Sequence, residues 1–409
     1  MTPNASSLRQ NNLSINAPNM NFITGTFNTP DLFTFTFNPP STLTRQAPLI
    51  ITNKSPAIGN HSWLGLSPKT ENGADERFLY ATACTEPPSI AAYSVKSRGA
   101  SITPINSKPV RARSGYVCAS KTHVYSCGGP TGEAFAIAPD GGVGELVQEL
   151  DFVDKGADDK PSGALHGDFG GLRHGSHSVD LSPDMRSLYI ADIGRNAIFT
   201  YSIDNDHASA AGNKQHLTLG SKHISPRPND GPRHTWPHPS GKILYSLQEH
   251  TSMVDLFTIA DDGVTLTHTH GVRIIPADKD PKDYWADEVR LSTRSAMAPR
   301  YMYASTRGLA AETKGYVAVF ELRPDGSVVS DEAICIWETP TSGGIANAIE
   351  PAPWTEDHGD KEFLAMTDSQ EGWVFILSFD GREVREAARV SLGRTEGGEV
   401  VQAATAVWL

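Results

Sequence analysis

The sequence has few cysteines and no long apolar run. Its 409 residues contain four cysteines, Cys84, Cys118, Cys127 and Cys335, without a CxxC pair or a zinc-type spacing to histidine, and we expect buried free thiols. Nowhere do roughly eighteen apolar residues follow one another, as a membrane-spanning helix requires. The N-terminal MTPNASSLRQNNLS also lacks the apolar segment of a signal peptide. These absences argue against a disulfide scaffold and a membrane protein, and they predict a cytoplasmic location.

Basic residues are outnumbered by acidic ones. The sequence holds 35 Lys and Arg against 47 Asp and Glu, a formal net charge of −12 at pH 7. Nucleic acids and anionic membranes are bound through basic surfaces that release counterions, so we expect neither as a partner. A small anionic substrate remains compatible with this charge, because a few arginines in one cleft set the local potential there.

The motifs of several cofactor and metal sites are missing. The glycine runs at Gly128 and Ser342 lack the Lys and Ser/Thr of a P-loop, and there is no GxSxG, HExxH or EF-hand loop. His268 and His270 alternate onto one face of a predicted strand and could ligate a metal. That strand is expected at the outer edge of its repeat, which favours exposed histidines instead. We therefore predict no metal and no cofactor.

A sequence pattern is repeated along most of the chain. A short apolar strand ends near a proline, a polar gap follows, and a second strand is built on Leu-Tyr or Met-Tyr, as in HSVDLSPDMRSLYIAD. The pattern occurs around Tyr80, Tyr189, Tyr245 and Tyr303. Repetition every roughly 45 to 60 residues, with several short strands in each unit, is typical of a β-propeller rather than of stacked helices.

Seven repeats of four strands account for the chain. Six of them cover about residues 62–108, 113–152, 176–224, 234–275, 287–338 and 346–392. A hairpin of NFITGTF and DLFTFTF precedes them without an innermost strand, whereas the C-terminal AATAVWL has that strand's pattern. Pairing the two would close the ring and remove both sheet edges. The sequence thus predicts an all-β fold, a seven-bladed β-propeller closed by its C-terminal strand on the N-terminal blade, as one domain over residues 19–409 after a flexible tail at 1–18.

Four ionisable residues interrupt the repeat where the innermost strand begins or the second strand ends. His177 opens the innermost strand of the fourth repeat, and Arg233 has the same place in the fifth. Glu249 and Arg307 hold matching places after the second strands of the fifth and sixth repeats. A single channel histidine is readily explained by a bond to a backbone carbonyl. Four ionisable groups at equivalent positions of three consecutive blades are instead expected to converge on one cavity.

These residue types suit a polyanionic acid that undergoes proton transfer. Two arginines offer rigid two-pronged donors for carboxylates or phosphates. A histidine and a glutamate beside them form a proton donor and acceptor pair whose pKa values the arginines can shift. We therefore take His177, Arg233, Glu249 and Arg307 as the candidate catalytic residues.

At these residues the chain resembles the eukaryotic 3-carboxy-cis,cis-muconate lactonising enzymes, members of the seven-bladed lactonase-type propeller superfamily. The resemblance runs from about residue 20 to the end and is strong from the fourth repeat onward, in DGPRHTWPHPSGKILYSLQEH, RYMYASTRG and TPTSGGIANAIEPAPW. The family's catalytic histidine, glutamate and two arginines fall on the four residues named above. The resemblance implies a metal-independent cycloisomerase of aromatic catabolism, in the β-ketoadipate pathway. A muconate carboxylate adds to the conjugated double bond, and the arginines stabilise the enediolate-like charge.

Two positions depart from the family's pattern, and several points stay open. Ile345 stands where a histidine is common, and His234 where a tryptophan is common, so the substrate could be another muconate. Either His177 or Glu249 could supply the proton. A lactone hydrolase of the 6-phosphogluconolactonase type and a non-catalytic propeller scaffold are the alternatives, because fold does not dictate function. A homo-oligomer is compatible with each of them.

Overall fold

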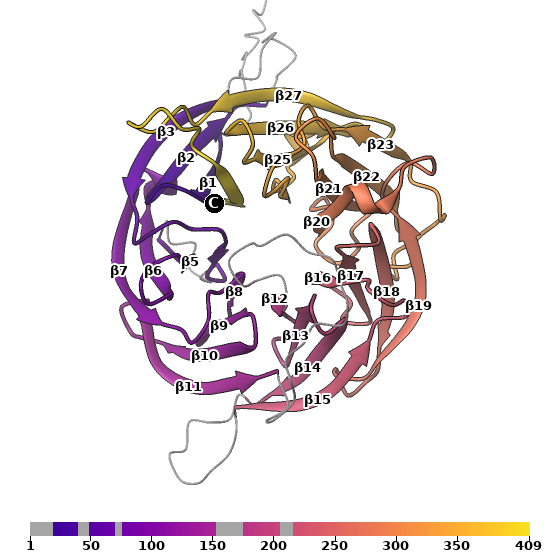
Figure 1. The fold of residues 1–409 in the computed structure, drawn as a ribbon, viewed down its shortest axis with the longest axis horizontal. Coiled ribbons are helices and arrows are strands. Elements are labelled where there is room, and N and C mark those ends of the chain that lie inside the picture. The colour runs from indigo at the N-terminus through magenta and orange to yellow at the C-terminus, as the bar shows by residue number, and fades with distance from the viewer. Residues whose placement is uncertain (1–18, 40–48, 70–75, 153–174, 205–215) are drawn as a thin grey trace, which may run out of the picture.

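Seven four-stranded antiparallel sheets surround a central axis like the blades of a propeller (Figure 1). This computed structural model describes residues 19–39, 49–69, 76–152, 175–204 and 216–409. The predicted all-β, seven-bladed β-propeller is therefore confirmed. The flexible tail predicted at residues 1–18 lies outside the described residues, and the assignment of one domain to residues 19–409 stays a prediction.

Each blade is a four-stranded meander read outward from the axis. In blades one to four the strands are β28 (Ala403–Trp408), β1 (Met20–Thr26), β2 (Asp31–Phe37) and β3 (Leu49–Pro56); β4 (Leu64–Leu66), β5 (Arg77–Ala83), β6 (Ser89–Lys96) and β7 (Ser101–Pro109); β8 (Tyr116–Ala119), β9 (His123–Gly128), β10 (Thr131–Ile137) and β11 (Val143–Asp151); and β12 (Ser176–Leu181), β13 (Ser187–Asp192), β14 (Ala197–Ile203) and β15 (Leu217–Ile224).

Blades five to seven repeat the same order. Their strands are β16 (Pro232–Pro237), β17 (Ile243–Gln248), β18 (Met253–Ile259) and β19 (Leu266–Arg273); β20 (Tyr284–Leu291), β21 (Tyr301–Gly308), β22 (Tyr316–Glu321) and β23 (Cys335–Glu338); and β24 (Ile349–Pro351), β25 (Glu362–Asp368), β26 (Trp373–Phe379) and β27 (Val384–Ser391). Short 3-10 helices span Ser97–Gly99, Pro281–Asp283 and Glu356–His358.

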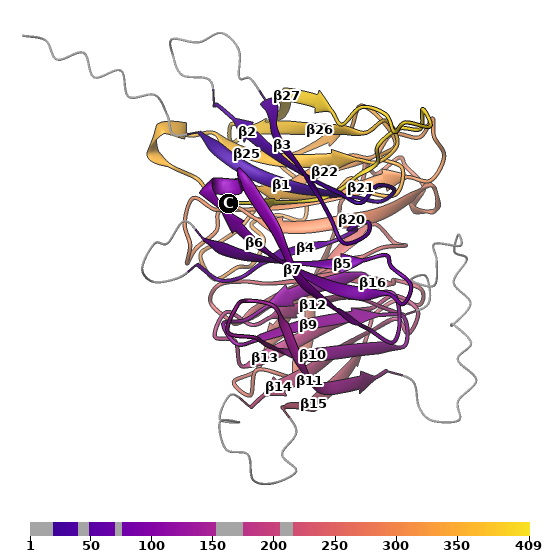
Figure 2. The ribbon, with the colours of Figure 1, turned by 90° about the vertical axis from the view of Figure 1, so that its left-hand side faces the viewer.

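Burial decreases from the middle of each blade to its edge. All six residues of β13, SLYIAD, are buried, because both faces of this strand pack against neighbouring blades. The outermost strand β15, LTLGSKHI, is mostly exposed or half-buried. Polar outer strands protect a sheet edge from pairing with another chain. Figure 2 shows outer strands β3, β7 and β11 on the side of the ring that faces the viewer.

The ring closes through the C-terminal strand, as predicted. β28 pairs antiparallel with β1, with Phe22 opposite Trp408, and the backbone N–H of Leu409 donates to the carbonyl of Asn21 at 2.9 Å. The rings of Phe22 and Trp408 lie 4.6 Å apart in a buried cluster that also includes side chains of blade seven. The last strand therefore belongs to the first blade's core.

The repeated tyrosines connect blades two, four, five and six to the blades that follow them. Each hydroxyl group donates a hydrogen bond across the blade boundary: Tyr80 to the Gly141 carbonyl at 3.0 Å, Tyr189 to the Gly263 carbonyl at 3.0 Å, Tyr245 to the Gly326 carbonyl at 2.6 Å, and Tyr303 to Glu362 Oε2 at 2.8 Å. Three of the acceptors lie in the turn between the third and fourth strands of the next blade. The Leu-Tyr pattern is thus a contact between blades as well as a strand signal.

Replacing Tyr245 by phenylalanine tests this connection. The ring would keep its packing, but the hydroxyl bond to Gly326 would be lost, so we expect a loss of about 1 kcal/mol in the free energy of unfolding. Urea unfolding of the purified variant measures it, and turnover should be unchanged. An unfolding free energy equal to the wild-type value would show that the bond contributes nothing.

The cysteines are less buried than the sequence predicted. All four cysteines are free, but only Cys127 is fully buried, and Cys84, Cys118 and Cys335 are half-buried. The prediction of buried thiols was wrong for these three, which lie at or near strand ends or on an outer strand.

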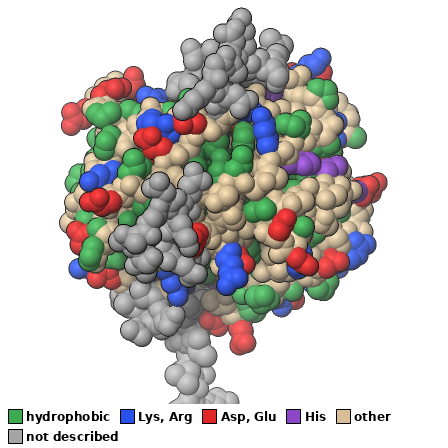
Figure 3. All heavy atoms as spheres, turned by 90° about the horizontal axis from the view of Figure 1, so that it is seen from below, with side chains coloured by type: hydrophobic (Ala, Val, Ile, Leu, Met, Phe, Trp, Pro, Cys, Tyr) green, Lys and Arg blue, Asp and Glu red, His purple; other side chains and the backbone are tan. Residues whose placement is uncertain are grey.

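On the side of the ring at the bottom of Figure 1, acidic and basic side chains are interspersed (Figure 3). No helix in the described ranges has the length and hydropathy needed to cross a bilayer.

Candidate active site

The four predicted residues meet at one mouth of the ring. The innermost strand of a blade runs antiparallel to its second strand, so the start of one lies beside the end of the other. His177 and Arg233 lie at the start of β12 and β16, Glu249 directly follows β17, and Arg307 lies near the end of β21. All four line the same pocket. The structure therefore brings together every residue that the repeat pattern had selected.

β-Bulges turn three side chains toward this mouth. The pairing of β12 with β13 passes from Ser176 to Ser178 and skips His177, and the pairing of β16 with β17 skips Arg233 in the same way. In blade six the pairing of β20 with β21 skips Asp287. An extra residue in one strand re-aims its side chain out of the regular alternation, which is common next to active sites. The local fold thus gives three consecutive blades the same functional position.

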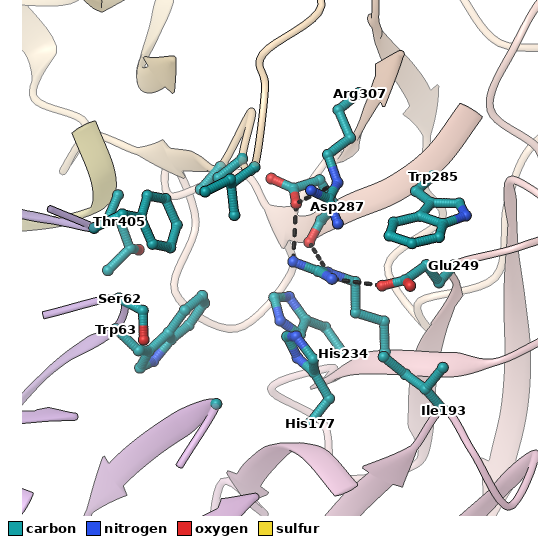
Figure 4. Close-up of a pocket in the computed structure, with 17 residues that line it drawn as sticks. Ser62, Trp63, His177, Ile193, His234, Glu249, Trp285, Asp287, Arg307 and Thr405 are labelled. Carbon is teal, nitrogen blue, oxygen red and sulfur yellow. Dashed lines mark hydrogen bonds and ion pairs between the residues drawn. The ribbon is translucent and has the colours of Figure 1, made fainter. Parts of the chain in front are cut away.

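The pocket has about 690 Å³ of unfilled space, its opening included. In Figure 4, Ser62, Trp63 and Thr405 lie across the pocket from Trp285 and Glu249. Asp287 and His234 also line the pocket, and the rest of the wall is mainly apolar and consists of Phe27, Gly115, Ile193, Ile345, Ala346, Ala348 and Ala404. Apolar walls with a few converging polar groups are typical of a site for a small molecule.

Arg233 is held between two carboxylates. Its Nη1 donates to Glu249 Oε2 at 2.5 Å, its Nη2 to Asp287 Oδ1 at 2.9 Å and its Nε to the Asp287 carbonyl at 3.1 Å. Burial acts to lower the pKa of Arg233, but Glu249 and Asp287 outweigh it and raise the pKa above its ordinary value. The guanidinium group is therefore charged and fixed before a substrate arrives, which is the condition for electrostatic preorganisation.

Arg307 approaches the same aspartate from blade six. Its Nε lies 3.9 Å from Asp287 Oδ1, its Nη1 donates to the Gly344 carbonyl at 3.2 Å, and its guanidinium carbon lies 4.9 Å from the ring centre of Trp285. Burial, and then the nearby Arg233, lower the pKa of Arg307 to about 10. It is still charged near neutral pH. Two cations in one buried pocket disfavour each other, so a bound anion would relieve this repulsion.

Neither His177 nor Glu249 carries the proton that a general acid would have to donate. Burial, and then Arg233 and His234, lower the pKa of His177 well below its ordinary value, so the imidazole is neutral. Burial acts to raise the pKa of Glu249, but Arg233 and His250 outweigh it and hold the pKa well below its ordinary value. The carboxylate of Glu249 is therefore ionised and serves first as the partner of Arg233.

Asp287 is a site residue that the sequence analysis missed. It bridges the two arginines, and its Oδ2 accepts the backbone N–H of Asn347 at 2.8 Å. Burial raises its pKa, although both arginines oppose the shift. A signal was present in the sequence: aligning ADEVRL with PRHTWP places Asp287 at the position of Arg233.

Two further wall residues are the departures noted in the sequence. Ile345 contributes an apolar side chain to the pocket. His234 contributes an imidazole whose Nδ1 lies 2.8 Å from Glu288 Oε1. The pocket thus has a further polar side chain, from the residue that directly follows the bulge residue Arg233.

The histidines of the outer strand lie far from this arrangement in the fold. His268 and His270 are on β19, the outermost strand of blade five, as predicted. They are half-buried rather than exposed, because each pairs with an aspartate: His268 Nε2 lies 3.2 Å from Asp255 Oδ1, and His270 Nε2 lies 3.0 Å from Asp331 Oδ1. Within the described ranges, no three His, Cys, Asp or Glu side chains are grouped closely enough to hold a metal ion.

Two relatives that are named as enzymes are similar to this chain in sequence. Muconate cycloisomerase 1 of Cutaneotrichosporon cutaneum is 41% identical over 392 residues, which cover 94% of this chain and 97% of that protein. Carboxy-cis,cis-muconate cyclase of Neurospora crassa is 34% identical over 227 residues, 53% of this chain and 57% of that protein.

Solved structures resemble the fold at low sequence identity. The periplasmic gluconolactonase of Pseudomonas aeruginosa superposes with a TM-score of 0.72 at 15% identity, covering 96% of this chain and 99% of that one. A Lactobacillus plantarum protein gives 0.71 at 19% identity, with 96% and 100% covered. The family model described as lactonase, 7-bladed beta-propeller, matches residues 41–339. Because that match spans most of the propeller and a relative aligned over nearly its whole length is 41% identical, the chain belongs to the seven-bladed β-propeller lactonase family.

Proposed function

We propose that this protein is an isomerase that closes 3-carboxy-cis,cis-muconate, or a related muconate, to a muconolactone. The observation that carries the proposal is a pair of buried arginines in one small pocket: Arg233 and Arg307 lie 2.9 and 3.9 Å from the same oxygen of Asp287. His177 and Glu249 line the same pocket. The relatives named muconate cycloisomerase 1 and carboxy-cis,cis-muconate cyclase support this choice of reaction.

The reaction is an intramolecular addition. One carboxylate oxygen of the muconate forms a C–O bond to the double-bond carbon that closes a five-membered ring. The π electrons move to the carbon α to the other carboxylate, where an enediolate-like charge develops, and a proton is added to that carbon. One carboxylate becomes a neutral lactone, so each turnover takes up one proton.

The arginines are suited to bind and stabilise this charge. Each guanidinium group can give a carboxylate two parallel hydrogen bonds. Three N–H groups of Arg233 already hold Glu249 and Asp287, which leaves two of its five N–H groups for a substrate carboxylate. Donors fixed in a buried site stabilise charge that develops in the transition state, and losing one costs about 10² to 10³ in kcat.

His177 and Glu249 have supporting roles in this proposal. Neutral His177 can donate one hydrogen bond to a substrate oxygen, since its buried Nδ1 has no hydrogen-bond partner among the described residues. Glu249 keeps Arg233 oriented through the 2.5 Å contact. The charged side chains of the pocket are balanced, with two arginines against the two carboxyl groups of Glu249 and Asp287. Each added substrate carboxylate therefore favours protonation of a nearby acid.

An assay with three substrates tests the function. Purified protein is incubated with 3-carboxy-cis,cis-muconate, cis,cis-muconate and 6-phosphogluconolactone, with diene absorbance and proton balance followed together. We expect one of the two dienes to lose its absorbance with uptake of one proton. Acid release from the lactone alone would indicate the hydrolase, and no turnover of any compound would support a non-catalytic scaffold.

The proposal also covers the metal requirement of the reaction and the location and partner of the protein. We propose a reaction that needs no metal, so turnover should survive extensive treatment with a chelator, and loss of turnover that zinc or magnesium restores would overturn this point. We also propose a cytoplasmic location and a small di- or tricarboxylate as the partner, without nucleic acid or membrane.

A further inference from the structure

A second acid and base pair adjoins the pocket. His234 and Glu288 directly follow Arg233 and Asp287 in β16 and β20, and their Nδ1 and Oε1 atoms lie 2.8 Å apart with both side chains 1% exposed. The His234 ring centre lies 5.1 Å from that of His177 (Figure 4). His234 Nε2, on the opposite edge of the ring from Glu288, is buried and has no hydrogen-bond partner among the described residues. This nitrogen is therefore available for a hydrogen bond to a ligand in the pocket.

Glu288 is the member of this pair that titrates near neutral pH. Burial raises the pKa of Glu288 to about 7, although Arg290 opposes the shift. Burial, and then Arg233 and Arg290, lower the pKa of His234 well below its ordinary value. A neutral imidazole therefore stands between an acid that titrates near pH 7 and the pocket. This is the arrangement of a relay, in which one ring nitrogen receives a proton as the other gives one up.

The other two candidates are weaker donors. Glu249 is ionised beside Arg233, so it has no proton to give. His177 is neutral, and no carboxylate of a described residue lies within ion-pair distance to supply a proton to its ring. General acids work best when their pKa is near the operating pH, which is the case for Glu288 behind His234.

We propose that Glu288, acting through His234, supplies the proton that is added to the substrate carbon. As the C–O bond forms and the π electrons reach the α carbon, the His234 Nε2–H bond breaks and a C–H bond forms. The proton on Glu288 Oε1 moves to Nδ1 of the same ring. The products are the lactone, a neutral His234 protonated on Nδ1, and an ionised Glu288. Solvent in the pocket then protonates His234 Nε2, and the Nδ1 proton returns to Glu288, which restores the starting state. This inference rests on the proposed function.

The surroundings stabilise the charge left on Glu288. Arg290 Nη1 donates to Glu288 Oε1, and the guanidinium carbon of Arg290 lies 4.1 Å from the ring centre of Trp236. Arg290 Nε donates to Glu350 Oε2 at 2.7 Å. The other titratable or charged groups that face the pair are Arg233, His177, Glu249, Asp287, Glu350, Asp180 and Tyr116.

Glu288→Gln tests the relay, because glutamine keeps the shape and cannot titrate. We expect kcat to fall by about 100-fold or more with KM within about threefold. Wild-type kcat/KM should decline above about pH 7, since Glu288 must be protonated, and this decline should be absent in the variant. Glu321→Gln is the control, since it removes a carboxylate of the same blade that pairs with Arg300 at 3.2 Å away from the pocket, and its kcat and pH profile should stay near wild type.

Further variants make the outcome decisive. His234→Gln should reproduce the loss in kcat, and circular dichroism and thermal unfolding show whether each variant is folded. Wild-type turnover with a flat profile from about pH 6 to 9 would overturn the relay whatever the variants do. So would a folded Glu288→Gln enzyme with wild-type kcat, or a His177→Gln variant that alone removes the alkaline decline. Wild-type protein inactive on both muconates would instead overturn the proposed function itself.

Discussion

Arg307→Ala is expected to abolish turnover while the protein stays folded. kcat/KM should fall by at least about 10²- to 10³-fold, because the guanidinium group stabilises the charge that develops on the substrate. The melting temperature should remain within a few degrees of wild type. Burial disfavours the Arg307 cation, whose pKa is lowered to about 10, and Asp287 would still have Arg233 at 2.9 Å. Loss of diene absorbance and thermal unfolding provide the two measurements.

Two further arginine variants sharpen this prediction. Arg307→Lys keeps the charge but loses the two-pronged geometry, so its activity should lie between those of wild type and Arg307→Ala. Arg300→Ala changes an exposed arginine just before the same strand, paired with Glu321 at 3.2 Å, and should leave both turnover and melting temperature unchanged. Retained turnover in Arg307→Ala would remove Arg307 from the catalytic set.

Deletion of residues 402–409 is expected to unfold the protein or to leave it aggregation-prone. The deletion removes β28, the innermost strand of blade one, and exposes the edge of β1 to other chains. It also removes Trp408, which is 7% exposed and packs on Phe22. Total stability of a folded protein is only about 5 to 15 kcal/mol, and a lost core strand is comparable to it. Soluble yield, circular dichroism and size-exclusion chromatography would show the result.

Point variants in the same strand provide a graded version. Trp408→Ala should cost about 3 to 5 kcal/mol in the free energy of unfolding, the usual cost of truncating a large buried aromatic side chain. Val407→Ala, at the neighbouring and half-buried position, should cost clearly less. A truncated protein that unfolds at the wild-type urea concentration would show that the ring does not depend on this strand.

The fold was largely predictable because its signals are local and repeated. Alternating apolar residues and turn residues define a strand pair without information from the rest of the chain. Tyr245 shows the limit of this information. Its place in the repeat marked a strand, but its bond to Gly326 became visible only when blades five and six were packed side by side. The half-buried state of Cys84, Cys118 and Cys335 was missed for a similar reason, since exposure depends on the packing around each strand.

The candidate site was predictable where charge interrupts an apolar repeat. His177, Arg233, Glu249 and Arg307 stood out because their positions are equivalent from blade to blade. Asp287 was overlooked although it occupies the third bulge in the same series. An acidic residue attracts less notice in a chain with 47 of them, and its importance lies in its two arginine neighbours rather than in its position.

The sequence by itself determined the number of blades, the closure of the ring and the mouth where ionisable residues gather, because all three depend on periodicity and on which residue follows which strand. Only the tertiary structure decided the charge states at that mouth. They depend on burial and on distances between blades: Arg233 is locked between Glu249 and Asp287, and Glu288 is buried beside His234. A pKa reflects the whole surroundings of a group in space, and adjacency in sequence does not specify those surroundings.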